Sequence, residues 1–215
     1  MRKTPFVNGE FYHIYNQGAY KQNVFFKNYD FERFLQSLEE FNTVRPIGSI
    51  YANSFFDEKI KLRRRTTKLV KIVCYCLNLN HYHFILQQIV DGGISEFMKR
   101  LGGYTRYINE KYKRNGVLFQ GKFKSKHINS NEYLLHLSAY VNLNNFVHKI
   151  KGCMFRSSWE EYVQNNGEKC EKEIILNQFK NKKEYKEFAE SSLKDIIERK
   201  QLFKELEGFF LSKST

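Results

Sequence analysis

The 215-residue sequence predicts an α+β domain followed by a helical extension. Segments rich in β-branched and aromatic residues, as strands are, lie between segments whose apolar residues recur at helical spacing. Two of the strand-like segments are separated by only three residues with turn chemistry, which is typical of an antiparallel hairpin. No apolar run approaches the ~18 residues that a membrane helix needs, so we expect no contact with a membrane.

The first expected elements are a strand, a loop and a helix. Bulky residues at 11–16 occupy strand-like positions before Gln17 and Gly18, and apolar residues at helical spacing follow from Phe31 to Phe41. Pro46 and Gly48 then end the helix. We expect residues 47–67 to form an irregular exposed loop or a flexible hairpin.

Residues 70–77 and 81–88 predict the hairpin, with residues 78–80 as its turn. A helical stripe follows over 94–108. Gly102 and Gly103 lie inside this helix, where each glycine costs ~1 kcal/mol relative to alanine. We therefore expect another backbone to approach closely at this point.

The rest of the chain predicts a basic link and further helices. Residues 111–126 contain six basic side chains and no acidic one. Ser130 or Asn131 is placed to cap a helix over 132–149, and a long helix follows over about 182–210. The simplest division is a domain over 1–150 and a helical C-terminal extension over 151–215.

The charge is unevenly distributed. The chain has 36 Lys and Arg against 23 Asp and Glu, which gives a net charge of +13. Residues 1–150 contain 23 basic and 11 acidic side chains, whereas residues 151–215 contain 13 and 12. With 16% aromatic residues, such a surface suits phosphate binding and base stacking, although aromatic residues that fill a core and lysines that keep a chain soluble give the same composition. The N-terminus lacks an apolar export signal, so we expect a cytoplasmic protein.

His81 and His83 are the first candidates for chemistry. At positions i and i+2 of a strand, their side chains share one face about 7 Å apart along the backbone. Two neutral imidazoles can bind one divalent ion and leave positions open for a third ligand and substrate oxygens. The alternative is that both are polar surface groups.

The segment Asn80-His-Tyr-His-Phe-Ile-Leu86 resembles the His-hydrophobic-His signature of the HUH single-strand DNA transferases. Further segments occur in the order found in REP-associated tyrosine transposases, the single-tyrosine branch of that superfamily with an IS200-like transposase domain. These segments are residues 11–19, 103–109, 116–124, 139–144 and 157–162.

This resemblance implies a ferredoxin-like antiparallel sheet with packed helices, a metal bound by His81 and His83, and a nucleophilic tyrosine at Tyr140. Asn144, four residues later on the same helix face, would be a third metal ligand. The family often has proline where Asn145 stands, a departure that bears on the helix end. Without the resemblance, Tyr140 is one aromatic residue on a helical stripe, and Tyr104 and Tyr107 are rival candidates. His13, His127, His136 and His148 are interpreted as structural or surface groups.

The implied activity is metal-dependent cleavage and strand transfer of single-stranded DNA at repetitive palindromic hairpins, through a 5'-phosphotyrosine intermediate. Mg²⁺ or Mn²⁺ suits such oxygen-rich chemistry, while two histidines would equally accept zinc. The alternatives are an inactive DNA- or RNA-binding protein of the same fold and a metal-dependent phosphodiesterase that uses water.

The expected partner is single-stranded DNA with a hairpin, bound in the prokaryotic cytoplasm at the nucleoid by a monomer or homodimer. Phosphates need basic side chains. The candidates for binding DNA are Lys61, Arg63, Arg64, Arg65, Lys113, Arg114, Lys122, Lys124 and Lys126.

Overall fold

The computed structural model describes residues 5–64, 67–148, 150, 154–164 and 167–212. Its centre is a five-stranded sheet in the order β4-β1-β3-β2-β5, in which all neighbouring strands are antiparallel. The strands are β1 (Phe11–Gln17), β2 (Val70–Asn78), β3 (His81–Gln88), β4 (Lys124–Ile128) and β5 (Phe155–Ser157).

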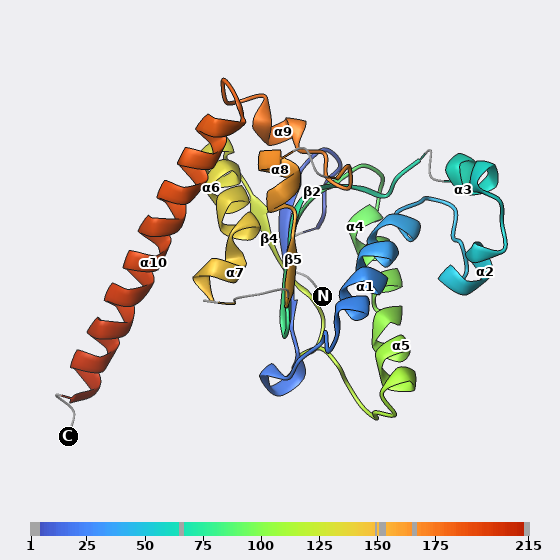
Figure 1. Cartoon of the computed structure of the whole chain (residues 1–215), viewed down its shortest axis with the longest axis horizontal. Helices are drawn as coiled ribbons and strands as arrows, with labels where there is room; N and C mark the ends of the chain where they lie inside the picture. The colour runs from blue at the N-terminus through green and yellow to red at the C-terminus, as the bar shows by residue number, and fades with distance from the viewer. Residues whose placement is uncertain (1–4, 65–66, 149, 151–153, 165–166, 213–215) are drawn as a thin grey trace.

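Helices cover both faces of the sheet (Figure 1). One layer contains α1 (Asn28–Glu40), α4 (Gly93–Leu101) and α5 (Gly103–Lys111), and the other contains α6 (Asn131–Asn142), α7 (Asn144–Val147) and α10 (Lys182–Ser212). The shorter elements are η1 (Ala19–Lys21), α2 (Ile50–Ser54), α3 (Glu58–Arg64), α8 (Trp159–Gln164) and α9 (Glu173–Leu176). Strands β1 to β4 follow the βαββαβ connectivity and the 4-1-3-2 order of a ferredoxin-like fold, which confirms the predicted fold class.

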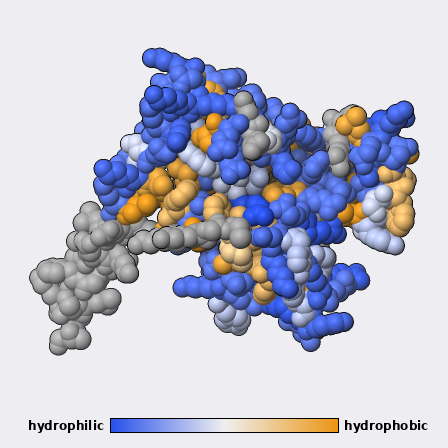
Figure 2. Space-filling view, in the orientation of Figure 1, coloured by the Kyte–Doolittle hydropathy of each residue, from blue (hydrophilic) through white to orange (hydrophobic). Residues whose placement is uncertain are grey.

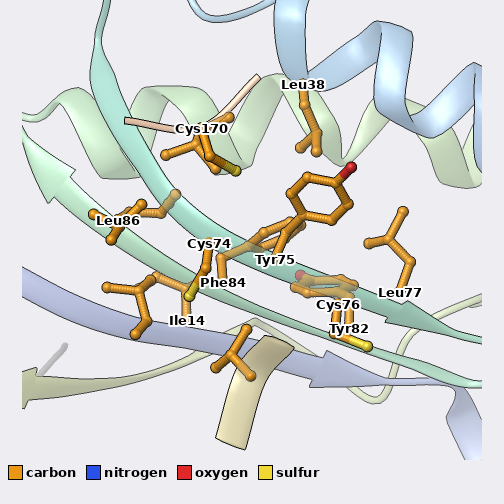
Figure 3. Packing of buried hydrophobic residues seen from close by; sticks show 14 of the residues in the cluster. Ile14, Leu38, Cys74, Tyr75, Cys76, Leu77, Tyr82, Phe84, Leu86 and Cys170 are labelled. Carbon is orange, nitrogen blue, oxygen red and sulfur yellow. The ribbon is translucent and has the colours of Figure 1, made fainter. Parts of the chain in front are cut away.

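Alternation along β3 decides which side chains meet which helix layer. Tyr82 and Phe84 point toward α1, where the Phe34 ring centroid lies 5.9 Å and 6.3 Å from theirs. Leu38 of α1 points toward Tyr75 on the neighbouring strand β2 (Figure 3). Since successive side chains alternate, His81 and His83 lie on the opposite face, under α6 and α7.

The segment 47–67 differs from its expected form. Among its described residues, two short helices, α2 and α3, replace the loop or hairpin, and Ser49 Oγ caps α2 by accepting from Ala52 N at 3.0 Å. Sequence reasoning missed them because five- and seven-residue helices show too little periodicity. Tyr51, Phe55 and Leu62 leave exposed apolar surface here, over α2 and α3 (Figure 2).

The helix expected over 94–108 is divided at Gly102 into α4 and α5. The expectation that another backbone approaches closely at Gly102 and Gly103 is wrong. A Cβ at Gly103 would meet nothing within 4 Å, and one at Gly102 would meet only carbonyl groups of α4. Gly102 has φ −57° and ψ −24°, a right-handed helical conformation that any residue adopts, so the junction between the two helices does not require glycine.

Two differences concern the later elements of the domain. Residues 124–128 of the expected link form β4, an exposed edge strand. Lysines stand at positions where a half-buried strand would have apolar residues, so the sequence pattern does not predict a strand here. The helix expected over 132–149 ends at Asn142 in the structure, and α7 follows after Leu143. The cap was predicted correctly, because Ser130 Oγ accepts from Tyr133 N at 3.1 Å.

The extension contributes to the sheet as well as to the helical layer. Its first described element is β5, which pairs with β2, and α10 packs along α6. The Tyr185 hydroxyl accepts from Asn142 Nδ2 at 2.9 Å across that contact. Within the described ranges, none of the helices combines the length and apolar character that crossing a membrane requires.

Candidate active site

A pocket of about 240 Å³ opens beside β1 and β3, below α6. Its walls bring together the His pair, the candidate nucleophile and one candidate DNA-binding lysine. The lining residues are Tyr15, Asn16, Gln17, His81, His83, Gln120, Lys124, Tyr140 and His148.

The orientation of His81 is fixed by Asn80. The Asn80 Nδ2 amide donates to the Lys21 carbonyl at 3.2 Å, so its Oδ1 faces His81 Nδ1 at 2.7 Å and accepts from it. A proton on Nδ1 makes His81 Nε2 the acceptor atom of this ring. Asn78 Nδ2 lies 2.9 Å from that Nε2 atom and donates to it. The His81 tautomer is therefore the one that binds a metal through Nε2.

Asn144 places a second acceptor beside this lone pair. Its Oδ1 atom accepts from Asn78 Nδ2 at 2.8 Å and lies 3.0 Å from His81 Nε2. Adjacent ligands of an octahedral ion with bonds of ~2.1 Å are separated by about 3.0 Å. The two acceptors thus have the spacing of neighbouring ligands, with Asn78 as their shared donor.

His83 is held from the other side by His13. His13 Nε2 lies 2.9 Å from His83 Nδ1, and the two rings are stacked with centroids 5.1 Å apart. Burial, reinforced by His13, His81 and His148, holds the pKa of His83 well below its usual value. Burial and the charge of Lys126 lower the pKa of His13 to about 4. Both imidazoles are therefore neutral at pH 7. A metal ligand such as His83 must be neutral, and so must His13 if it is to support that ligand without adding positive charge.

A divalent ion fits this donor set of two imidazole nitrogens and one amide oxygen. Among the described residues, no three His, Cys, Asp or Glu side chains form a metal-binding group. The spacing between Asn144 Oδ1 and His81 Nε2 therefore makes the Asn144 amide the candidate third protein ligand next to the His pair.

Tyr140 lies over the His pair from α6. Its ring stands edge-on to His83, with centroids 5.6 Å apart and planes inclined by 82°. Burial raises the pKa of the Tyr140 phenol, and a hydrogen bond with the Asn144 side chain opposes that shift. The rival Tyr104 is on the other face of the sheet, where its hydroxyl donates to the Val24 carbonyl at 3.0 Å. The other rival, Tyr107, lies in the same layer, where its hydroxyl accepts from Lys111 Nζ at 2.7 Å.

The candidate DNA-binding residues fall into three segments. Lys124 lines the pocket, and Lys126 lies 4.8 Å from the centroid of the Tyr133 ring on α6. Lys122 lines a separate cavity with Met98 and Lys99 of α4, in the other helix layer. Lys113 and Arg114 are in the loop that follows α5.

The remaining four candidates belong to the segment around α3. This helix lies beyond α1 and α4, in the layer opposite α6 (Figure 1). There Lys61 pairs with Glu58 at 2.7 Å, and Arg63 is exposed. Arg64 ends the helix, and Arg65 is outside the described residues. The structure thus does not bring Lys61 or Arg63 to the pocket.

Two residues of the site were not found by sequence reasoning. His13 and His148 were interpreted as structural or surface groups, yet His13 contacts His83, and the His148 ring centroid lies 4.6 Å from that of His81. The available signal was the strand pattern at 11–16, which puts His13 and Tyr15 on one face. Its use required knowing that β1 pairs with β3, so that Tyr15 stands opposite His83.

A comparison with family models matches part of this chain. Residues 57–144 match the family model described as Transposase IS200 like. The matched segment contains the His pair, Tyr140 and Asn144. Over these residues the chain is similar to the IS200-like transposase family.

One solved structure, "Structure of the REP associates tyrosine transposase bound to a REP hairpin", is similar over 76% of this chain and 84% of that chain, with a TM-score of 0.48 and 12% identity. A comparison with curated proteins gave no match.

Proposed function

We propose that this protein cleaves and rejoins single-stranded DNA next to a hairpin, through a covalent bond between Tyr140 and a 5'-phosphate. The observation that carries the proposal is the placement of a tyrosine, two neutral imidazoles and an amide oxygen at one pocket of a ferredoxin-like sheet. The ordered segments that resemble REP-associated tyrosine transposases support a palindromic hairpin as the substrate.

Each side chain of the pocket has a separate task. His81, His83 and Asn144 would hold Mg²⁺ or Mn²⁺, which polarises the scissile phosphate and stabilises charge on its oxygens. Asn80 keeps His81 in the tautomer whose Nε2 atom is an acceptor, and His13 engages Nδ1 of His83, which leaves Nε2 of His83 for an ion. Lys124, at the pocket wall, is placed to neutralise a neighbouring phosphate.

The reaction exchanges one phosphoester for another. The Tyr140 oxygen attacks phosphorus and loses its proton to solvent, while the bond to the 3' oxygen breaks and that oxygen takes up a proton. Because burial raises the pKa of the phenol, the free enzyme holds Tyr140 protonated at pH 7. Charge stabilisation at the phosphate must therefore accompany its ionisation.

The test is adduct formation with a hairpin labelled at its 3' end. Wild type should give a shifted band on a denaturing gel, because the labelled fragment carries the 5'-phosphate at the cut. Tyr140→Phe removes one oxygen and keeps the ring, so it should bind the hairpin and form no adduct. Tyr104→Phe and Tyr107→Phe, on the other helix layer, are the matched controls and should form the adduct.

Each alternative predicts a different gel. Cleavage by wild type without an adduct would assign the chemistry to water and favour a phosphodiesterase. Hairpin binding without cleavage in Mg²⁺ or Mn²⁺ would favour a DNA- or RNA-binding protein that keeps only the fold.

A further inference from the structure

Backbone strain is concentrated at one end of the sheet. Among the described residues, three that are not glycine adopt the left-handed conformation: Tyr20 at φ 53°, Lys21 at φ 60° and Lys113 at φ 52°. This conformation is unfavourable for residues with a side chain, and it persists only where the surroundings impose it. Such strain clusters at functional sites, so its location calls for a functional explanation.

The strained residues belong to two loops that hold each other. Ala19 N donates to the Leu118 carbonyl at 3.0 Å, and Gln22 Nε2 donates to the Val117 carbonyl at 3.2 Å. Arg114 donates to Gln22 Oε1 at 2.7 Å, which links the loop after α5 to the same side chain. Hydrogen bonds thus fix both loops, and the left-handed residues are part of an ordered surface.

This surface adjoins the candidate active site. The Lys21 carbonyl accepts from Asn80, and Asn80 in turn holds His81. Gly18 makes the turn possible, because a Cβ there would collide with the Gln22 carbonyl oxygen. Both loops lie at the lower end of the sheet in Figure 1, where β3 begins. A strand of DNA that enters the pocket would therefore pass them.

Tyr20 is the most exposed large side chain of this surface. It is 99% exposed, although a tyrosine ring normally buries much of its area in packing. Lys21 follows it in the chain, and Lys113 is in the loop that Arg114 links to Gln22; both lysines are exposed. A solvated ring on a fixed backbone, with cations on its own loop and on the loop bonded to it, has the chemistry of a site where a base stacks and its phosphates are neutralised.

We propose that Tyr20 is a stacking platform for an unpaired base of single-stranded DNA, and that Lys21 and Lys113 contact the phosphates on either side. The proposal rests on the proposed function in one respect, namely that this base is next to the nucleotide whose phosphate enters the pocket. Stacking uses the π-face that every base has, so the platform should tolerate sequence changes at that base.

The experiment compares two substitutions at one position in a Tyr140→Phe background, which prevents turnover. Tyr20→Asn removes the ring but tolerates the left-handed backbone, whereas Tyr20→Phe keeps the ring. Tyr20→Asn should bind a single-stranded oligonucleotide about tenfold more weakly, and Tyr20→Phe should bind as the background does. A 2-aminopurine placed next to the cut should be quenched by Tyr20→Phe and remain bright with Tyr20→Asn.

A blunt duplex of the same sequence separates stacking from charge. Its bases are already stacked, so its affinity should be equal for both variants. Equal affinity of the two variants for the single strand, or equal losses on single strand and duplex, would overturn the platform.

Cleavage by the protein with an intact Tyr140, measured in parallel, tests the proposed function separately. A tenfold loss with Tyr20→Asn in a protein that never cuts would support the platform and overturn the transferase.

Discussion

The metal-free protein should lose stability in mild acid through His13. Its side chain is 7% exposed, and burial with the charge of Lys126 lowers its pKa to about 4 in the folded state, against 6.5 in an exposed imidazole. Above pH 6.5 both states are neutral and the full stability is present. As the pH falls from 6.5 toward 4, the unfolded chain binds a proton that the folded chain does not. The difference between 6.5 and about 4, at ~1.36 kcal/mol per pH unit, corresponds to about 3 kcal/mol.

Urea unfolding in chelating buffer at several values from pH 7 to pH 4 measures this loss. His13→Gln keeps a hydrogen-bonding side chain but has no group that titrates there. The free energy of unfolding of wild type relative to His13→Gln should therefore fall by about 3 kcal/mol over that range. His127→Gln, on the edge strand β4, controls for removal of a half-exposed imidazole. Parallel curves for wild type and His13→Gln would refute the reasoning that His13 is buried in its neutral form.

Three further outcomes follow from the structure. His81→Ala should abolish Mn²⁺ binding in calorimetry while leaving the thermal unfolding of the metal-free protein within a few degrees of wild type; undiminished binding would exclude His81 as a ligand. Replacing Lys122, Lys124 and Lys126 together with alanine should reduce the salt slope of single-strand binding by about 2, at ~0.7 per phosphate contact, and an unchanged slope would mean that they touch no phosphate. Ser130→Ala should lower the free energy of unfolding by about 1 kcal/mol through loss of the α6 cap, whereas Ser130→Asp should retain it.

Local patterns were enough to predict the elements that carry the site. The hairpin over 70–88 was predicted because both strands are apolar and the turn between them is short, and α6 was predicted from its cap. The spacing of His81 and His83 placed them on one face for the same local reason. The positions of Tyr140 and Asn144 came from the family resemblance, and the structure brings both to the His pair.

Contacts between distant segments could not be predicted in this way. The hydrogen bond between His13 and His83 spans 70 residues and depends on the β1–β3 register. In the edge strand β4, Lys124 and Lys126 lie on the same face as Ile128, so it lacks the alternation of a half-buried strand. The left-handed conformation of Tyr20 is equally non-local, because carbonyl groups of residues 117 and 118 hold its loop.

The His pair depends on a part of the chain outside the segment that matches the transposase family. That segment, residues 57–144, contains the proposed ligands, but each histidine of the pair is supported through an earlier residue. His13 holds His83 directly, and the Lys21 carbonyl orients Asn80 for His81. β1, which supplies His13, is also the strand between β3 and β4 in the sheet. If the matched segment binds a metal as proposed, residues 13 and 21 outside it would help to set the affinity, since the partners of metal-bound histidines typically change it by about 10- to 100-fold.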